Sequence, residues 1–361
     1  MTEERKNQLS QITIKGFKSI KDCELLDLGN INVFIGANGA GKSNFISAFE
    51  MLQKVLVGEL AHYALKKGID PLLYNGKEAT DSILAEFYFG ENLYSFELEW
   101  TDNDSLFFRE EKIGTLGEGG HKESKVQELA HSAKIERETL QALINPQWRV
   151  YQFNNTSPTS KIKSENGVGD YDTLLWDASN FAVYLYHLRE SYPDSYKKIL
   201  RAIQRVAPYF KDFELKPKAE NNEQIVLRWK QKGLDNTLLP SQLSDGTLRF
   251  ICLATLLLQP AELQPATIII DEPELGLHPY AITILAELVK KAATRKQIIL
   301  ATQSVEFLDH FEPEDVIVVD RSENGSEFKR LDLEQLKAWL EDDYTLGELW
   351  NKNLFGGRVS N

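Results

Sequence analysis

The sequence predicts an α/β protein with a mostly parallel core sheet, an antiparallel β subdomain and a helical lobe. Three observations carry this prediction. An apolar strand at residues 31–35 leads into a glycine-rich turn and then a helical pattern. Short runs that alternate apolar and polar residues follow between residues 81 and 113, which is typical of an antiparallel meander. From residue 240 helical patterns alternate with the buried strands ATIIID, QIILAT and DVIVVD, which indicates a parallel sheet.

Composition narrows the class of protein. The 361 residues are 42% hydrophobic, enough for a sizeable core, and the net charge of -13 argues against a general nucleic-acid coat, although a local basic groove stays open. Two cysteines, Cys23 and Cys252, are too few for a disulfide framework and suit a reducing compartment. The chain opens with polar residues, and its longest apolar run, residues 250–258, is too short to span a bilayer. We therefore expect a cytoplasmic protein without a membrane partner.

The glycine-rich turn GANGAGKS, residues 36–43, fits the P-loop spacing G-x-x-x-x-G-K-[ST]. Backbone N–H groups of such a loop wrap phosphates, Lys42 reaches the β and γ phosphates, and Ser43 can hold Mg²⁺. A glycine-rich surface turn, the alternative, would not require Lys42 and Ser43 together. The predicted nucleotide-binding residues are Gly36, Ala37, Asn38, Gly39, Ala40, Gly41, Lys42, Ser43 and Asn44.

A pair of carboxylates follows the strand in TIIIDEPE. An acid at such a strand end holds Mg²⁺ in P-loop proteins, a role that Asp271 fits. The next carboxylate, Glu272, is suited to polarise an attacking water and is the candidate general base. An acidic helix cap before Pro273 would explain one carboxylate but not the matching P-loop far upstream.

Three further stretches resemble ABC-type ATPases. LSDGTLRF resembles their signature motif, with Ser244, Asp245 and Gly246 at the positions that matter. Alone, SDG is an ordinary turn and helix cap, but it precedes the Asp271 strand as the resemblance requires. ELGLHP, which contains His278, takes the place of the D-loop, and ATQS the place of the switch residue after the next strand.

Gln303 stands at that switch position, where most ABC ATPases have histidine. Glutamine does not titrate near neutral pH, but it donates and accepts hydrogen bonds, so it can position a water without taking its proton. The departure bears on the rate of hydrolysis more than on nucleotide binding. A polar strand cap is the alternative.

Within this superfamily, IKGFKSI and GANGAGKSNF resemble the SMC, RecF and OLD-like branch, above all compact stand-alone ATPases of the RecF/OLD type without a Toprim domain. The resemblance implies a single ABC-type ATPase domain over residues 1–361. Its expected parts are a P-loop lobe at 1–165 with a charged insertion at about 111–147, a helical signature lobe at 166–265, the Walker B and switch strands at 266–335 and a C-terminal amphipathic segment at 336–361.

The resemblance also implies a mechanism. Two copies would pack head to tail around ATP and Mg²⁺, so that Ser244, Asp245 and Gly246 contact the ATP bound by the partner. Gln152 is the candidate for the glutamine loop that contacts Mg²⁺, with Gln147 as a rival, and His278 would lie at the dimer interface.

Several functions stay open at this point. The leading one is an ATP-hydrolysing homodimeric switch that controls a DNA-directed or anti-phage defence effector, such as a separate nuclease, with DNA as a further partner. A non-hydrolysing ATP-dependent scaffold and a DNA-repair ATPase of the RecF type are the alternatives. The motor of a membrane transporter fits IKGFKSI poorly, and a small-molecule kinase leaves the signature stretch unexplained.

Overall fold

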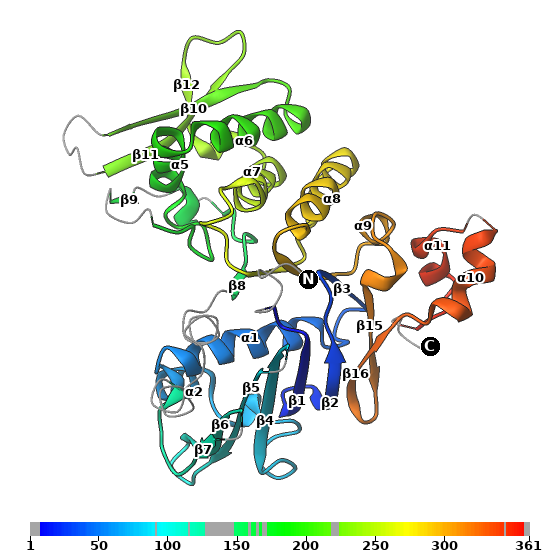
Figure 1. Cartoon of the computed structure of the whole chain (residues 1–361). Helices are drawn as coiled ribbons and strands as arrows, with labels where there is room; N and C mark the ends of the chain where they lie inside the picture. Colours follow the sequence, from blue (N-terminus) through cyan, green and yellow to red (C-terminus); the bar gives the residue numbers. More distant parts are fainter. Residues whose placement is uncertain are drawn as a thin grey trace. The chain divides into compact units, whose positions relative to one another are not determined.

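The computed structural model describes residues 8–90, 92–114, 116–126, 148–157, 160–163, 166–167, 172–217, 224–342 and 344–356. The chain forms two compact units (Figure 1): unit 1 comprises Met1–Arg149 and Ile299–Asn361, and unit 2 comprises Val150–Ile298. Most of the charged insertion predicted at about 111–147, including Gln147, lies outside the described residues.

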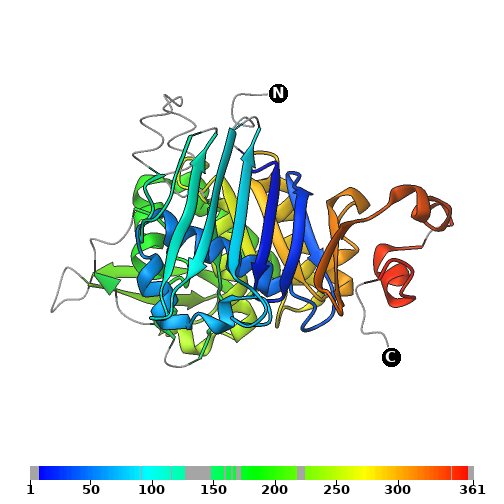
Figure 2. The same ribbon diagram turned by 90° about the horizontal axis from the view of Figure 1, so that it is seen from below.

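Unit 1 contains a six-stranded sheet that confirms the predicted antiparallel subdomain. Its order is β2-β1-β4-β5-β6-β7, and its blue and cyan strands lie side by side in Figure 2. Side chains of β4 alternate strictly between half-buried and buried, because one face of the sheet covers the core. The strands are β1 (Gln11–Phe17), β2 (Ile20–Asp27), β4 (Ser82–Phe89), β5 (Asn92–Trp100), β6 (Leu106–Ile113) and β7 (Leu116–Glu118).

The core strand that precedes the P-loop also belongs to unit 1. β3 (Ile31–Ile35) pairs in parallel with β15 (Val316–Ser322), with Val33 opposite Val316, and β15 pairs antiparallel with β16 (Gly325–Arg330). On its other side β3 neighbours β14 (Gln297–Thr302). The parallel strands are buried apolar runs, as a sheet covered on both faces requires.

Helix α1 (Lys42–Leu56) runs from the P-loop across the antiparallel sheet in Figure 1. Its apolar face is buried, and Phe45 packs against Phe34 of β3 with ring centroids 4.4 Å apart and the rings tilted by 31°. Phe49, one turn later, meets Phe87 of β4 at 6.4 Å. The buried aromatic residues of the meander are therefore core of this sheet rather than an exposed stacking surface.

Shorter elements complete unit 1. They are α2 (Leu60–Lys67), η2 (Asp70–Leu72), α9 (Val305–Leu308), η5 (Pro313–Asp315), α10 (Leu333–Glu341) and α11 (Leu346–Asn351). Helix α11 lies in the predicted C-terminal segment at 336–361, whereas α10 begins before it, at Leu333. Two strands are divided between the units. β8 (Trp148–Tyr151) begins in unit 1 and ends in unit 2, whereas β14 begins in unit 2 and ends in unit 1.

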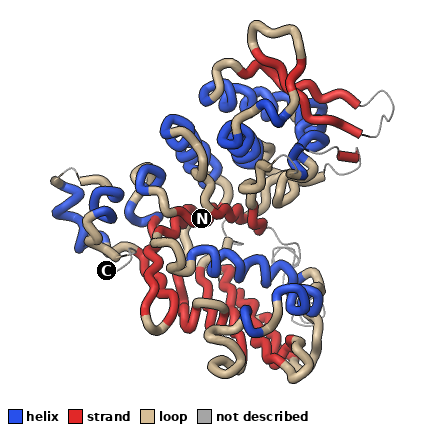
Figure 3. Tube along the Cα trace, turned by 180° about the vertical axis from the view of Figure 1, so that it is seen from behind, coloured by secondary structure: helices blue, strands red, loops and turns tan. Residues whose placement is uncertain are grey.

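Unit 2 is mainly helical, with one prominent antiparallel hairpin (Figure 3). In the hairpin Phe210 stacks almost parallel on Trp229, with ring centroids 5.5 Å apart. Its elements are η3 (Lys161–Lys163), β9 (Asn166–Gly167), α5 (Phe181–Ser191), α6 (Pro193–Val206), β10 (Phe210–Pro217), β11 (Gln224–Gln231), β12 (Thr237–Leu238) and η4 (Pro240–Gln242).

Three further elements carry the site residues of unit 2: α7 (Asp245–Leu258), β13 (Thr267–Asp271) and α8 (Pro279–Ala293). Residues 250–258 of α7 are buried, so the longest apolar run of the sequence forms a core helix. No helix among the described residues combines the length and the apolar character needed to cross a membrane.

Candidate functional site

The P-loop of unit 1 has the backbone geometry that its glycines predict. A Cβ at Gly36 would lie 2.3 Å from the carbonyl oxygen of Val319, so no side chain fits there. Gly41 has a φ of 122° and is the N-cap of α1, a conformation that an L side chain rarely adopts. Both glycines therefore allow the loop to pack between β15 and the start of α1, where the positive end of the helix dipole lies.

Lys42 is buried within this loop, with 6% of the residue exposed. Its Nζ donates to the carbonyl oxygens of Gly36 at 2.7 Å and Ala37 at 3.0 Å. The ammonium group therefore lies inside the curve of its own loop. Ser43, the next residue, is exposed in the first turn of α1.

A hydrogen-bond network of two serines and one asparagine holds the P-loop in place, although no sequence pattern reveals it. Ser326 Oγ of β16 donates to the carbonyl oxygen of Ala40 at 2.6 Å and lies 2.7 Å from Ser19 Oγ, also within hydrogen-bond distance. Asn44 Nδ2 donates to the same Ser19 Oγ at 2.7 Å. Ser19 stands in the stretch IKGFKSI, but Ser326, 307 residues away from Ser19, carries no local sequence signal.

Gln303 directly follows β14, as Gly36 directly follows the neighbouring strand β3. Gln303 is half-buried. The backbone after it is fixed, because Ser304 Oγ caps α9 by accepting from the N–H of Phe307 at 3.1 Å. Unit 1 thus contains both the P-loop and the predicted switch residue, at the ends of adjacent strands.

The carboxylates of unit 2 lie where the sequence predicts them, at the end of β13. Asp271 is its last residue, and both Asp271 and Glu272 are half-buried. Glu272 has a φ of 47°, the left-handed conformation that a non-glycine residue adopts at a cost of about 1–3 kcal/mol. Such strain gathers at functional sites, and here it falls on the candidate base.

The signature stretch begins helix α7. Ser244 is its exposed N-cap and accepts from the N–H of Thr247 at 3.2 Å. A Cβ at Gly246 would lie 2.2 Å from the carbonyl oxygen of Gly276 in the D-loop-like segment. Gly246 is therefore required for the close approach of the start of α7 to the D-loop-like segment within unit 2, apart from any contact with a nucleotide.

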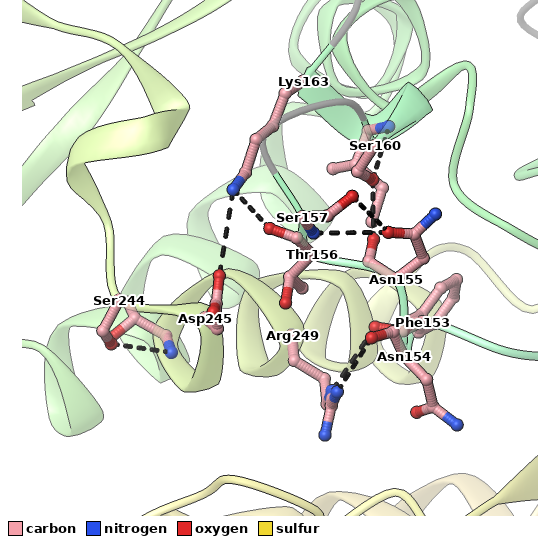
Figure 4. A network of polar contacts seen from close by, with 12 residues as sticks. Phe153, Asn154, Asn155, Thr156, Ser157, Ser160, Lys163, Ser244, Asp245 and Arg249 are labelled. Atoms are coloured by element: carbon pink, nitrogen blue, oxygen red, sulfur yellow. Dashed lines mark hydrogen bonds and ion pairs between the residues drawn. The ribbon is translucent and has the colours of Figure 1, made fainter.

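Arg249, one turn into α7, links this helix to the D-loop-like segment and to the segment after Gln152, although no sequence pattern singles it out. Its guanidinium donates to the carbonyl oxygens of Phe153 at 3.3 Å and Asn154 at 3.2 Å (Figure 4), and also to that of Leu275. The residue is 7% exposed, and burial lowers the pKa of its guanidinium. Arg249 belongs to the stretch LSDGTLRF, but its hydrogen-bond partners Phe153 and Asn154 are distant in sequence, so the stretch does not predict these contacts.

A second cation links the start of α7 to the segment after Gln152. Lys163 Nζ lies 3.8 Å from Asp245 Oδ1 and donates to the carbonyl oxygen of Thr156 at 2.5 Å (Figure 4). The Asp245 side chain is 72% exposed, so this ion pair is weak. Asp245 therefore stays accessible at the helix N-terminus.

Two predicted residues of unit 2 have backbone or capping roles of their own. Gln152 directly follows β8, and its N–H donates to the carbonyl oxygen of Trp176 at 2.9 Å. His278 is the N-cap of α8, where its Nδ1 accepts from the N–H of Tyr280 at 3.3 Å. His278 thus has a structural task in the helix cap.

Comparison with known proteins places this geometry in a family. The profile of the family described as "AAA domain, putative AbiEii toxin, Type IV TA system" matches residues 31–309. The chain belongs to this family. The match takes in the P-loop, the signature stretch, the Asp271 strand and Gln303.

Solved structures agree on the fold of this AAA-family chain. It is similar to an SMC head bound to the C-winged helix domain of ScpA, with a TM-score of 0.60 at 17% identity over 91% of this chain and 99% of that one. Smc heads of Pyrococcus furiosus and Pyrococcus yayanosii follow with TM-scores of 0.58 and 0.56, identities of 16% and 12%, and coverage of 93% of this chain and 99% of each. These similarities confirm the predicted fold, which is that of SMC head domains.

Among curated proteins, an uncharacterized protein of Methanocaldococcus jannaschii, MJECL44, is 48% identical over 40 residues. The matched segment covers 11% of this chain and 12% of that protein, so the likeness is limited to a short stretch.

Proposed function

We propose that this chain binds ATP with Mg²⁺ and hydrolyses it to ADP and phosphate. The observation that carries the proposal is the P-loop, in which two glycine positions exclude a side chain and a buried lysine begins the helix. This cradle fits the phosphates of a nucleotide, because Lys42 Nζ is surrounded by loop carbonyls that it can exchange for phosphate oxygens.

The other site residues take the following roles in this proposal. The hydroxyl of Ser43 and the carboxylate of Asp271 offer the oxygen ligands that Mg²⁺ prefers, with Gln152 as a third ligand directly or through water. When bound, the ion neutralises charge that develops on the phosphates. Glu272 takes a proton from the attacking water, and Gln303 holds that water by hydrogen bonds.

We further propose that ATP joins two copies of the chain. Ser244 and Asp245 are exposed at the N-terminus of α7, and such a helix end favours an anion. In a head-to-tail dimer the Ser244 hydroxyl and the backbone N–H groups of Asp245 and Gly246 would donate hydrogen bonds to the γ-phosphate of ATP held by the partner. Nucleotide state would then control whether the two copies are closed.

The family description supports a role in controlling an effector. It names a putative toxin of a toxin–antitoxin system, and one of the similar solved structures is an SMC head bound to a domain of ScpA. We propose a separate effector subunit, with a nuclease in an anti-phage defence system as the leading candidate. Direct binding of DNA is part of the same proposal.

One observation favours a second function, an ATP-dependent scaffold that does not turn over. Gln303 replaces a titratable residue, and glutamine can hold water without accepting its proton. Steady phosphate release under ATP excess would exclude the scaffold. Binding without release would exclude the hydrolase.

The mass of the purified chain, measured with and without ATP, tests the main proposal. Glu272→Gln should keep ATP affinity, lower turnover by about 100-fold or more, and trap an ATP-dependent dimer. Ser244→Arg in the same background should return the monomer mass, because it places a bulky cation at the proposed trans contact. Unchanged turnover in Glu272→Gln would remove Glu272 from the base role.

A further inference from the structure

A pocket of about 620 Å³ lies in unit 1 on one flank of the P-loop. Gly39 and Asn44 form the side that it shares with the loop, and residues 71–73 line it from the segment after α2. A Cβ at Gly39 would meet no atom within 4 Å, so the loop opens freely into this space. The volume suits a small molecule.

Three cations from separate segments line the pocket: Lys18 after β1, Lys67 at the end of α2, and Arg321 in β15. No carboxylate is among the lining residues that the structure describes. This is unusual in a chain with a net charge of -13. The lining therefore selects for negative charge.

The three cations are not equivalent. Lys18 is already engaged, because its Nζ donates to Ser47 Oγ at 2.7 Å. Burial is the main cause of its lowered pKa, and the nearby charge of Lys67 contributes. Lys67 and Arg321 are exposed, and within the described part of the chain no carboxylate lies within 4.0 Å of either. Their charges are available to a ligand.

The proposed nucleotide site decides what such a ligand is, so this inference rests on the proposed function. If the triphosphate lies on the P-loop, the group in the adjoining pocket is attached next to the phosphates and is the nucleoside. The nucleoside of ATP is uncharged and would leave Lys67 and Arg321 without a counter-charge. A phosphate on the ribose would supply it.

We infer that the pocket takes a nucleoside 5′-triphosphate whose ribose carries a further phosphate, with Lys67 and Arg321 as its contacts. The shared chemistry has two sources. One is a free nucleotide with a ribose phosphate. The other is the 5′-triphosphate end of an RNA strand, in which the first ribose is esterified to the next phosphate.

The experiment compares the affinities of wild-type chain for ATP, adenosine 3′-phosphate 5′-triphosphate and a 5′-triphosphorylated RNA trinucleotide. Low ionic strength, about 10 mM, keeps the charge interactions unscreened. The matched variants are Lys67→Gln with Arg321→Gln, and as control Lys66→Gln with Lys329→Gln, which removes the same charge outside the pocket.

We expect a ribose-phosphorylated ligand to bind wild type and control at least about tenfold more tightly than ATP. In the pocket variant the affinities for the ribose-phosphorylated ligand and for ATP should differ by no more than about threefold, while its ATP affinity stays near that of wild type. A gain for the free nucleotide alone, or for the RNA alone, supports the inference and identifies the source.

Two results would overturn it. If wild type binds ATP and binds the other two ligands with the same affinity, the pocket does not recognise a ribose phosphate. The proposed ATPase function would be unaffected by that result. If the pocket variant still prefers a ribose-phosphorylated ligand to ATP, Lys67 and Arg321 are not its contacts. Absence of any ATP binding overturns the proposed function itself and this inference with it.

Discussion

Two buried cations, Lys42 in unit 1 and Arg249 in unit 2, both bind main-chain carbonyls, but at very different sequence distances. Lys42 donates to residues 6 and 5 positions earlier in its own loop. Arg249 donates to residues 96, 95 and 26 positions away. The first arrangement organises one turn, whereas the second joins a helix to two loops.

The chemistry of the two side chains fits this difference. An ammonium on a flexible stem can exchange one set of oxygens for another, as a phosphate-binding lysine must. A guanidinium presents five donors in a fixed planar fork, which suits a permanent link between segments. We therefore expect Lys42 to govern ligand binding and Arg249 to govern the stability of its unit.

The largest expected effect is that of Lys42→Met on nucleotide affinity. Loss of two charged hydrogen bonds to phosphate should weaken ATP binding about a thousandfold, while the free energy of unfolding changes by about 1 kcal/mol or less. Calorimetric titration and thermal unfolding measure the two quantities. A large loss of stability at unchanged affinity would reverse the roles assigned to the two cations.

Arg249→Met should do the opposite. It removes the donor from three carbonyls, and we expect the free energy of unfolding to fall by about 3 kcal/mol. ATP affinity should stay within about threefold of wild type, since the P-loop residues belong to unit 1. Arg249→Lys is the control, and it should recover part of the stability. A variant as stable as wild type would mean that the carbonyl contacts contribute nothing.

The same contrast of distances explains which features are predictable from the sequence. The P-loop is predictable because Gly36, Lys42 and Ser43 lie in one short loop, so their spacing in the sequence is enough to predict the conformation of that loop. The strands at residues 31–35 and 81–113 are predictable because apolar patterning is also local. Arg249 and Ser326 escape prediction, because their partners lie about 95 and 286 residues away and no local pattern encodes them.

The strained backbone of Glu272 is likewise invisible in the sequence, since φ depends on how β13 meets the following turn. Glu272→Gly should relieve this strain and raise the free energy of unfolding by about 1 kcal/mol, while turnover is lost. Glu272→Gln is the matched control, because it loses turnover but keeps the strain and the stability. Equal stability of the two variants would show that the left-handed conformation costs nothing here.

The smallest effect concerns Gln303, the residue of unit 1 that we propose holds the attacking water. If Gln303 acts by position and not by charge, wild-type turnover should show no titration that depends on this residue near pH 6.5, the ordinary pKa of a histidine. Gln303→His introduces a group that titrates there, so turnover should change by about threefold between about pH 5.5 and 7.5. Gln303→Ala should lower turnover at every pH without a new titration.

A flat profile in Gln303→His, together with full activity in Gln303→Ala, would place Gln303 outside the reaction and leave it as a strand cap. In that case the γ-phosphate in unit 1 would be held by the P-loop and its buried lysine without help from Gln303. The contrast between Lys42 and Arg249 would stand, because Lys42 would still be the cation that exchanges loop carbonyls for phosphate oxygens.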